Sequence, residues 1–418
     1  MFLYQLLDMQ NMALAPWNSV ARFMAQTLKS AQCPTSRYEC GRALEAQIAM
    51  FERSTRFHEK PPFNIKSTKF RGEPIEVEIK TVHKTPFCHL LHFDRATRHP
   101  EIAQHLVGDP KLLIITPMSG HFATLMRGTV EAMLPSHDVY ITDWVDAKNV
   151  PLSQGYFDLE DQIGYLMDVI QSLGANLHLL AISQASVSIL CAVALLAEQE
   201  TPVEPLSMTL IGGPIDARGQ PCALSEEAKS HSLSWFRTAQ IQMVPTYYAG
   251  AFRRVYPGIM QLLDRMAMSL DSHITEQVQY YRHLVRGDDD AVEAHEAFYN
   301  EFLAVMDVPE EFHLQYIERA YQRHDLANGS FVWRSSKVNP ATITKTALLT
   351  VEGELDDLSP AGHTRAALDL CSNLPAEMKQ SHLEIGVGHY GVFNGRKWRN
   401  NIQPLVHQFI RKHSATGE

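Results

Sequence analysis

The chain has 418 residues, of which 45% are hydrophobic and 20% are charged, a composition typical of a folded protein with one large domain or two. Its formal net charge is −10 and no run rich in Lys and Arg stands out, so the sequence argues against nucleic-acid binding. No apolar stretch is long and uncharged enough to cross a bilayer, which argues against a transmembrane protein.

Residues 1–60 are expected to form an N-terminal helical extension, because Met, Leu and Phe recur there at helical spacing. The region Met1–Ala31 has no basic start and carries Asp8 among its apolar residues. This pattern favours an amphipathic helix over a signal peptide. Two interpretations are open for the extension: a packing or homodimer-forming segment, and a helix that seeks an apolar surface.

The six cysteines show no spacing typical of a metal site, so no metal is expected. Their scatter predicts reduced thiols in a cytoplasmic protein. They are Cys33, Cys40, Cys88, Cys191, Cys222 and Cys371.

Residues 61–224 are expected to form the first part of an α/β core. The period-two alternation of 75–79 predicts a half-buried antiparallel strand, with 87–93 as its partner. Strands and helices then alternate, which indicates a mainly parallel sheet covered on both faces. The predicted strands are 112–115, 138–141, 177–182 and 208–211, and the predicted helices lie near 122–134 and 158–173.

The alternation stops after residue 224. Residues 225–340 are expected to form an almost wholly helical cap, or lid, rich in aromatic side chains. Residues 341–418 supply the second part of the core, with strands at 347–351 and 382–385 and a final helix over 396–412. The predicted fold class is therefore α/β, a mostly parallel sheet with an inserted helical cap.

Ser183 lies between the buried strand 177–182 and an apolar helix. A Ser at such a tight turn forms a nucleophile elbow, which lifts the hydroxyl above the sheet edge. The usual pattern is G-x-S-x-G, because side chains crowd the turn. Here the two small positions are Ala181 and Ala185, the next smallest residue type.

A nucleophilic Ser needs a base, and the base needs a carboxylate to orient it. In an α/β-hydrolase the chain order is Ser, acid, His. The strand 347–351 runs into Asp356 and Asp357, and the last strand runs into His389. The sequence thus predicts a Ser183–Asp356–His389 triad, with Asp357 as the competing acid.

The oxyanion hole is expected from two backbone N–H groups. One belongs to Gln184, directly after the nucleophile, and the other to the loop after the first parallel strand. In that loop Ser119 is the first choice and Met118 the second. His121 is either a substrate contact or an ordinary loop histidine.

The segment 386–391 matches G-x-G-x-x-G but does not predict a dinucleotide site. Such a motif must open a strand–helix–strand unit with an acid about 20 residues further on. No further strand is expected after residue 391. The glycines more simply shape the His389 loop, and no cofactor is predicted.

Several stretches match one known family. They are Pro61–Ser67, Pro117–His121, Thr142–Ala147, Gly212–Arg218, Val351–Asp357 and Gly388–Gly391. On these runs the chain resembles bacterial intracellular polyhydroxybutyrate depolymerases over nearly its whole length. More distantly, its core is similar to that of polyhydroxyalkanoate synthases.

The resemblance implies an α/β-hydrolase that cleaves 3-hydroxybutyrate ester links in cytoplasmic storage granules. There is one departure, because family members carry Cys where this chain has Ser183. Ser183 is either a natural variant or a replacement of that Cys. The difference puts thiol-dependent steps, such as thiolytic release to coenzyme A, in doubt for this chain.

A polyester substrate suits a cap with paired aromatic residues, which offer apolar surface with polar tips. Tyr247, Tyr248 and Phe252 are expected to line the polymer entrance. The predicted function is hydrolysis of polyhydroxybutyrate to oligomers and monomer. Two alternatives are kept: a synthase-like hydroxyacyl transferase, and a granule-associated protein with a vestigial site.

Overall fold

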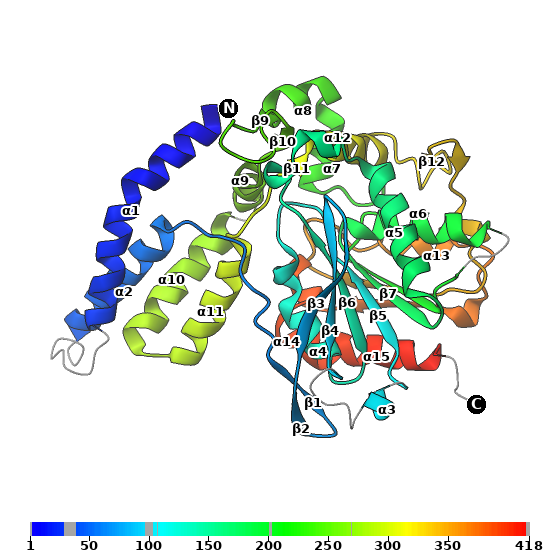
Figure 1. The fold of residues 1–418 in the computed structure, drawn as a ribbon, viewed down its shortest axis with the longest axis horizontal. Coiled ribbons are helices and arrows are strands. Elements are labelled where there is room, and N and C mark those ends of the chain that lie inside the picture. The colour runs from blue at the N-terminus through cyan, green and yellow to red at the C-terminus, as the bar shows by residue number, and fades with distance from the viewer. Residues whose placement is uncertain are drawn as a thin grey trace.

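The computed structural model describes residues 2–28, 39–96, 103–106, 108–199, 203–268 and 270–414 (Figure 1). Cys33, one of the six cysteines considered above, lies outside the described residues. The five described cysteines, namely Cys40, Cys88, Cys191, Cys222 and Cys371, are all free thiols. In the described part of the chain, no helix combines the length and the apolar character needed to cross a membrane.

An eight-stranded sheet forms the centre of the molecule, in the order β15-β14-β8-β7-β5-β6-β4-β3. Only the β3–β4 and β4–β6 pairs are antiparallel, and the other neighbours run parallel. The strands are β3 (Glu78–Lys84), β4 (Cys88–Asp94), β5 (Lys111–Ile115), β6 (Asp138–Trp144), β7 (Leu177–Ile182), β8 (Ser207–Ile211), β14 (Ala347–Gly353) and β15 (Lys379–Glu384). The mostly parallel sheet and the serine turn after β7 make this an α/β-hydrolase fold, as the sequence predicts.

Helices cover both faces of the sheet, so the side chains of β5, β7, β8 and β14 are buried almost throughout on both faces. One face packs under α5 (Leu159–Leu173), α6 (Ala185–Ala197) and α13 (Ala366–Leu370). The other packs under α4 (Arg127–Met133) and α15 (Gln403–Lys412). Along β5, Leu113 faces the first cluster and Leu112 the second, which is the alternation expected of a strand.

The predicted strand over 75–79 is wrong in one respect, because the segment is split. β2 (Glu73–Glu76) pairs with β1 (Ser67–Phe70) in a separate hairpin, and β3 begins only at Glu78. Val77 separates the two strands and donates its N–H to the Lys66 carbonyl at 2.9 Å. Period-two alternation identifies an extended segment but does not say which neighbour each half pairs with.

The cap lies between β8 and β14. Its helices are α7 (Ala223–Ser230), α8 (Leu233–Ala239), α9 (Gly258–Met268), α10 (Leu270–Arg286), α11 (Asp289–Phe302) and α12 (Glu310–Tyr316). The expectation of an almost wholly helical insertion misses two small sheets. They are β9 (Gln242–Met243), β10 (Arg254–Tyr256) and β11 (Val308–Pro309), and the hairpin of β12 (Val332–Trp333) and β13 (Ser336–Lys337). Strands of two or three residues are too short to show a period in the sequence.

The N-terminal extension forms a helical hairpin of α1 (Phe2–Leu28) and α2 (Glu39–Thr55), and α2 lies beside α10 (Figure 1). Asn18 of α1 is buried and donates from Nδ2 to the Glu52 carbonyl at 2.6 Å, which ties the two helices together. The opposite side of α1 is exposed and apolar. Its side chains recur at spacings of three: Leu6, Met9 and Met12, then Trp17, Val20 and Phe23.

Candidate active site

The turn between β7 and α6 places Ser183 at the carboxyl edge of the sheet. Ser183 has φ 55°, a left-handed conformation that is uncommon for a residue with a side chain. Its N–H donates to the Ile211 carbonyl of β8 at 2.7 Å, which holds the strained turn in place. Strain of this kind is concentrated at functional sites, where the surrounding structure enforces it.

His389 joins Ser183 to Asp356 through two hydrogen bonds. His389 Nε2 lies 3.0 Å from Ser183 Oγ, and His389 Nδ1 lies 2.8 Å from Asp356 Oδ2. Both His389 and Asp356 are buried, at 6% and 5% exposure, so the contacts are shielded from water. The structure therefore brings the three predicted triad residues together from three separate strand ends.

Asp356 is itself held in one orientation. Its Oδ1 accepts hydrogen bonds from the N–H groups of Leu358 and Ser359, at 3.0 and 2.8 Å, which leaves Oδ2 for His389. Gly212 gives the pair room, since a Cβ there would lie 3.3 Å from both Asp356 Oδ2 and the His389 ring. Of the two candidate acids, it is Asp356, and not Asp357, that contacts His389.

A cavity of about 150 Å³ opens above Ser183. Gln184, Ser119 and Met118, the three residues considered for the oxyanion hole, all line it. Gln184 is the N-cap residue of α6, so the partial positive charge at that helix end points toward the cavity. The assignment of particular N–H donors stays a prediction.

The loop that carries Ser119 is fixed from two sides. On the core side, Thr116 N–H donates to Thr142 Oγ1 at 2.9 Å. On the cap side, the Gly120 carbonyl accepts from Met306 N–H at 2.7 Å, and the Ser119 carbonyl accepts from the Arg265 guanidinium of α9. The cap thus sets the position of the loop that the sequence assigns to the oxyanion hole.

Further side chains line the Ser183 cavity that the sequence did not single out. Arg265 comes from α9, and Tyr390 lies directly after His389. His313 and Tyr316 come from α12, and the Tyr316 O–H donates to the Gln184 carbonyl at 3.4 Å. Tyr390 could have been found from the sequence, since it directly follows the predicted base. The other three come from distant segments of the cap, where no neighbouring motif points to them.

Burial keeps two histidines of this cavity neutral. It lowers the pKa of His121 well below its usual value, and the nearby Arg265 charge lowers it further. It lowers the pKa of His313 to about 3. His121 lines the cavity, and its Nε2 lies 3.4 Å from Tyr390 Oη. Whether His121 contacts substrate, one of the two roles considered from the sequence, stays a prediction. Neither neutral ring adds a positive charge beside Ser183.

The structure does not bring the three predicted substrate residues to Ser183. Tyr247 and Phe252 lie in the loop between β9 and β10 and are 59% and 54% exposed. Tyr248 packs against Tyr4 of α1, with ring centroids 6.2 Å apart. None of the three is among the described residues that line the Ser183 cavity. The aromatic composition of the cap drew attention to these three residues, but composition does not show whether a side chain lines the Ser183 cavity.

Comparisons with known proteins add the following. Residues 212–414 match the model of a protein family described as PHB de-polymerase C-terminus, where PHB stands for polyhydroxybutyrate. The matched range contains Asp356 and His389 but not Ser183. The resemblance noted from the sequence is thus confirmed over this part of the chain. A comparison with curated proteins found no match.

Solved structures of similar fold include the monoacylglycerol lipase of Paleococcus ferrophilus, with 13% identity, a TM-score of 0.43, and coverage of 73% of this chain and 97% of that one. A thermophilic esterase from Thermogutta terrifontis has 11% identity and a TM-score of 0.41, and the match covers 84% of this chain and 98% of that one. The fold assignment comes from this chain's own sheet order and serine turn. With the family match, it indicates an ester hydrolase.

Proposed function

We propose that this protein hydrolyses the ester bonds of polyhydroxybutyrate, with Ser183 as nucleophile, His389 as general base and acid, and Asp356 as the group that orients His389. One observation carries the proposal. It is the unbroken chain of hydrogen bonds from Ser183 Oγ through His389 to Asp356. The family match of residues 212–414 supports the choice of polyester.

The reaction proceeds in two balanced halves. As Ser183 Oγ attacks the ester carbonyl carbon, His389 Nε2 takes the hydroxyl proton. The tetrahedral intermediate then expels the alkoxide, which receives that proton and leaves as one polymer end. In the second half a water gives its proton to His389 and attacks the acyl-serine, and the carboxylic acid leaves as Ser183 regains its proton.

Negative charge on the carbonyl oxygen needs donors in place before the reaction begins. The Gln184 and Ser119 N–H groups are proposed for that role, with the α6 N-terminus adding its dipole. Asp356 stabilises the His389 imidazolium that forms during each half-reaction. The apolar setting of the cavity strengthens these interactions, because less water screens them.

Contact with an insoluble polyester is proposed for the exposed apolar face of α1. The side chains of Trp17, Val20 and Phe23 are 65%, 52% and 70% exposed on that face. An exposed apolar stripe marks an interaction surface more often than an ordinary solvent face. The proposed place of action is therefore the surface of polyhydroxyalkanoate granules in the cytoplasm.

The double variant Trp17→Gln/Phe23→Gln tests this contact. We expect it to reduce co-sedimentation with native granules several-fold and to leave hydrolysis of a short soluble ester unchanged. Val82→Gln on β3, an exposed apolar side chain at the far edge of the sheet, is the matched control. If light scattering shows that the wild type is a dimer and the variant a monomer with full granule binding, α1 is a homodimer interface instead.

One assay separates hydrolysis from the two alternatives. Native granules are incubated with the protein, with and without coenzyme A, and free 3-hydroxybutyrate, its coenzyme A ester and polymer mass are followed. Free acid alone supports the proposal. A coenzyme A ester supports acyl transfer, and no product supports a vestigial site. A single adduct on Ser183 after treatment with a serine-directed phosphonate identifies the nucleophile independently of the substrate.

A further inference from the structure

A second, larger cavity lies on the other side of α9 from Ser183. Its volume is about 650 Å³, and it is lined by the α1–α2 hairpin, α9, α10 and α11. Arg265 and Gln261 of α9 face the Ser183 cavity, whereas Leu262 and Met266 face the second cavity. One helix is therefore a wall of both cavities. A volume in this range is typical of sites for small organic ligands.

The walls of the second cavity are largely apolar. Side chains from four separate segments of the chain meet there: Leu7, Met50, Phe57, Ile259, Leu262 and Val305. These side chains could accommodate a hydrocarbon or polyester chain, but they cannot by themselves select one. Selection depends on the polar groups at the cavity wall.

His295 is one of these polar groups, and it lacks a partner. Its ring is stacked between Tyr280 and Tyr299, with centroid distances of 4.2 and 4.4 Å. Both ring nitrogens are shielded from solvent, and no described residue forms a hydrogen bond with either. Burial lowers the pKa of His295 to about 4, so the ring is neutral near pH 7. A buried polar group without a partner is rare and points to an absent one.

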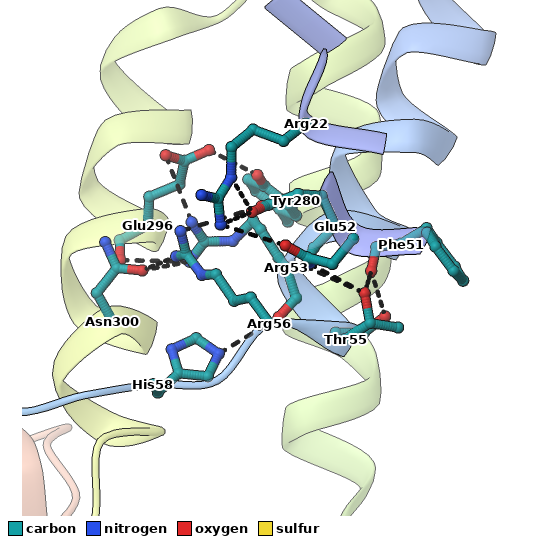
Figure 2. Close-up of polar contacts among 12 residues, drawn as sticks. Arg22, Phe51, Glu52, Arg53, Thr55, Arg56, His58, Tyr280, Glu296 and Asn300 are labelled. Carbon is teal, nitrogen blue, oxygen red and sulfur yellow. Dashed lines mark hydrogen bonds and ion pairs between the residues drawn. The ribbon is translucent and has the colours of Figure 1, made fainter. Parts of the chain in front are cut away.

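Arg53 and Arg56 lie at the same wall of the second cavity, at the end of α2 (Figure 2). Arg53 reaches Glu296 at 3.5 Å and Asn300 at 3.1 Å, both on α11. Arg56 also donates to Asn300, and its guanidinium lies 4.0 Å from Glu52. Figure 2 shows the two guanidiniums side by side between the helices.

Three guanidiniums and two carboxylates form this cluster, but only Arg53 and Arg56 line the cavity, because the Arg22 side chain is 57% exposed to solvent. The guanidiniums of Arg22, Arg53 and Arg56 share two carboxylates, Glu52 and Glu296, among the ion pairs of the described residues. Burial, and then the charge of Arg53, lower the pKa of Arg56. Arg53 and Arg56 both line the cavity, and guanidinium forks bind carboxylates and phosphates in a bidentate way. The largely apolar walls favour a carboxylate that ends a hydrocarbon-like chain.

The third cationic side chain that lines the second cavity, Lys148, is outnumbered by carboxylates. Its ammonium contacts Asp146 at 3.1 Å, and Asp307 is nearby. Asp307 also accepts a hydrogen bond from Tyr4 Oη at 2.5 Å. A ligand anion is thus directed toward the two arginines and away from Lys148.

We propose that the second cavity binds a long, mostly apolar carboxylic acid, with its carboxylate at Arg53 and Arg56 and its chain along α9. Two sources share this chemistry: a fatty acid, and the acid end of a hydroxyalkanoate oligomer. The site does not depend on the proposed hydrolysis. Because α9 also holds the Ser119 loop through Arg265, an occupant of the second cavity lies one helix away from the reaction cavity.

Binding is tested in the full chain carrying Ser183→Ala, so that no ester is cleaved during the measurement. Calorimetric titration with dodecanoate and with a 3-hydroxybutyrate tetramer should give one saturable site for at least one acid, with a raised melting temperature. The acid with the lower dissociation constant identifies the source. Dodecanol, which lacks the charge, should bind at least about tenfold more weakly, because each unpaired charged contact costs more than about 1.4 kcal/mol.

Two variants locate the site. Arg56→Met should weaken binding of the acid about tenfold or more and leave dodecanol unaffected, whereas Arg411→Met, an arginine in a remote ion pair with Asp109, should change neither. Leu262→Trp should fill the second cavity and abolish binding of both ligands. Melting temperatures are recorded to confirm that each variant folds. Absence of saturable binding, or an affinity for the acid unchanged in both Arg56→Met and Leu262→Trp, would overturn the proposal.

Discussion

The two cavities on either side of α9 differ in how their reactive and charged groups are arranged. Around Ser183, the hydroxyl, imidazole and carboxylate already hydrogen-bond one another, and Asp356 is fixed by two backbone N–H groups. In the second cavity, Arg53 and Arg56 form ion pairs with Glu296 and Glu52 at a wall that is otherwise largely apolar. The first arrangement is typical of a site organised for chemistry before the substrate arrives, and the second of a site that binds a mostly apolar ligand.

Removal of the nucleophile should have the largest effect and should affect one cavity only. We expect Ser183→Ala to lower the rate of ester hydrolysis by at least about 1,000-fold, because a triad without its nucleophile loses covalent catalysis. Acid binding in the second cavity should be unchanged. The rate is measured on granules and on a soluble ester. More than about a tenth of the wild-type rate would refute the role of Ser183.

The two neighbouring aspartates should differ strongly. Asp356→Asn keeps the shape of the side chain but loses the charge that stabilises the His389 imidazolium, and it favours the wrong tautomer. We expect a loss on the order of 10³-fold in kcat, against less than about tenfold for Asp357→Asn. Steady-state kinetics of both variants check this. If Asp357→Asn is the more damaging change, the acid has been assigned to the wrong residue.

The aromatic loop between β9 and β10 tests whether a surface far from Ser183 serves the polymer. The double variant Tyr247→Ala/Phe252→Ala should lower turnover of granules a few-fold and spare a short soluble ester, which needs fewer remote contacts. Phe236→Ala is the contrasting variant. Phe236 is a fully buried residue of the cap, so this substitution should lower the unfolding free energy by roughly 3–5 kcal/mol. Equal losses on both substrates, with a lower melting temperature, would make the loop a packing element.

The smallest expected difference between the two cavities lies in how much their buried histidines contribute to the loss of stability at acid pH. Burial lowers the pKa of His313 beside Ser183 to about 3 and that of His295 to about 4. On acidification these histidines take up protons in the unfolded chain before they do so in the folded protein. The part of the unfolding free energy that depends on their neutral form is therefore fully present above about pH 6.5 and is lost as the pH falls toward their pKa values in the folded protein.

His313→Gln should therefore flatten the loss of stability on acidification more than His295→Gln, because its pKa is shifted further. Urea unfolding at a series of pH values between 4 and 7 measures the two slopes. An unchanged slope in His313→Gln would mean that this ring is not kept neutral by its burial.

Local pattern was sufficient for the core. The strand over Leu177–Ile182 has the bounds that the sequence predicts, and β5, β6, β8 and β14 overlap their predicted segments. Buried parallel strands are continuous apolar runs, and each ends in a turn of small or polar residues, so they stand out without knowledge of their neighbours. Pairing was less predictable, as the split between β2 and β3 shows.

The sequence by itself determined the strands of the parallel core, the elbow at Ser183 and the order of acid and base, because residues at the ends of parallel strands meet at one edge whatever the cap does. The sequence also favoured Asp356 over Asp357, and the tertiary structure places the Asp356 carboxylate against His389. Only the tertiary structure decided where the cap aromatics point and that α1, α2 and α9–α11 line a second cavity. That cavity is formed by segments far apart in the chain, and such contacts leave no periodic trace in the sequence.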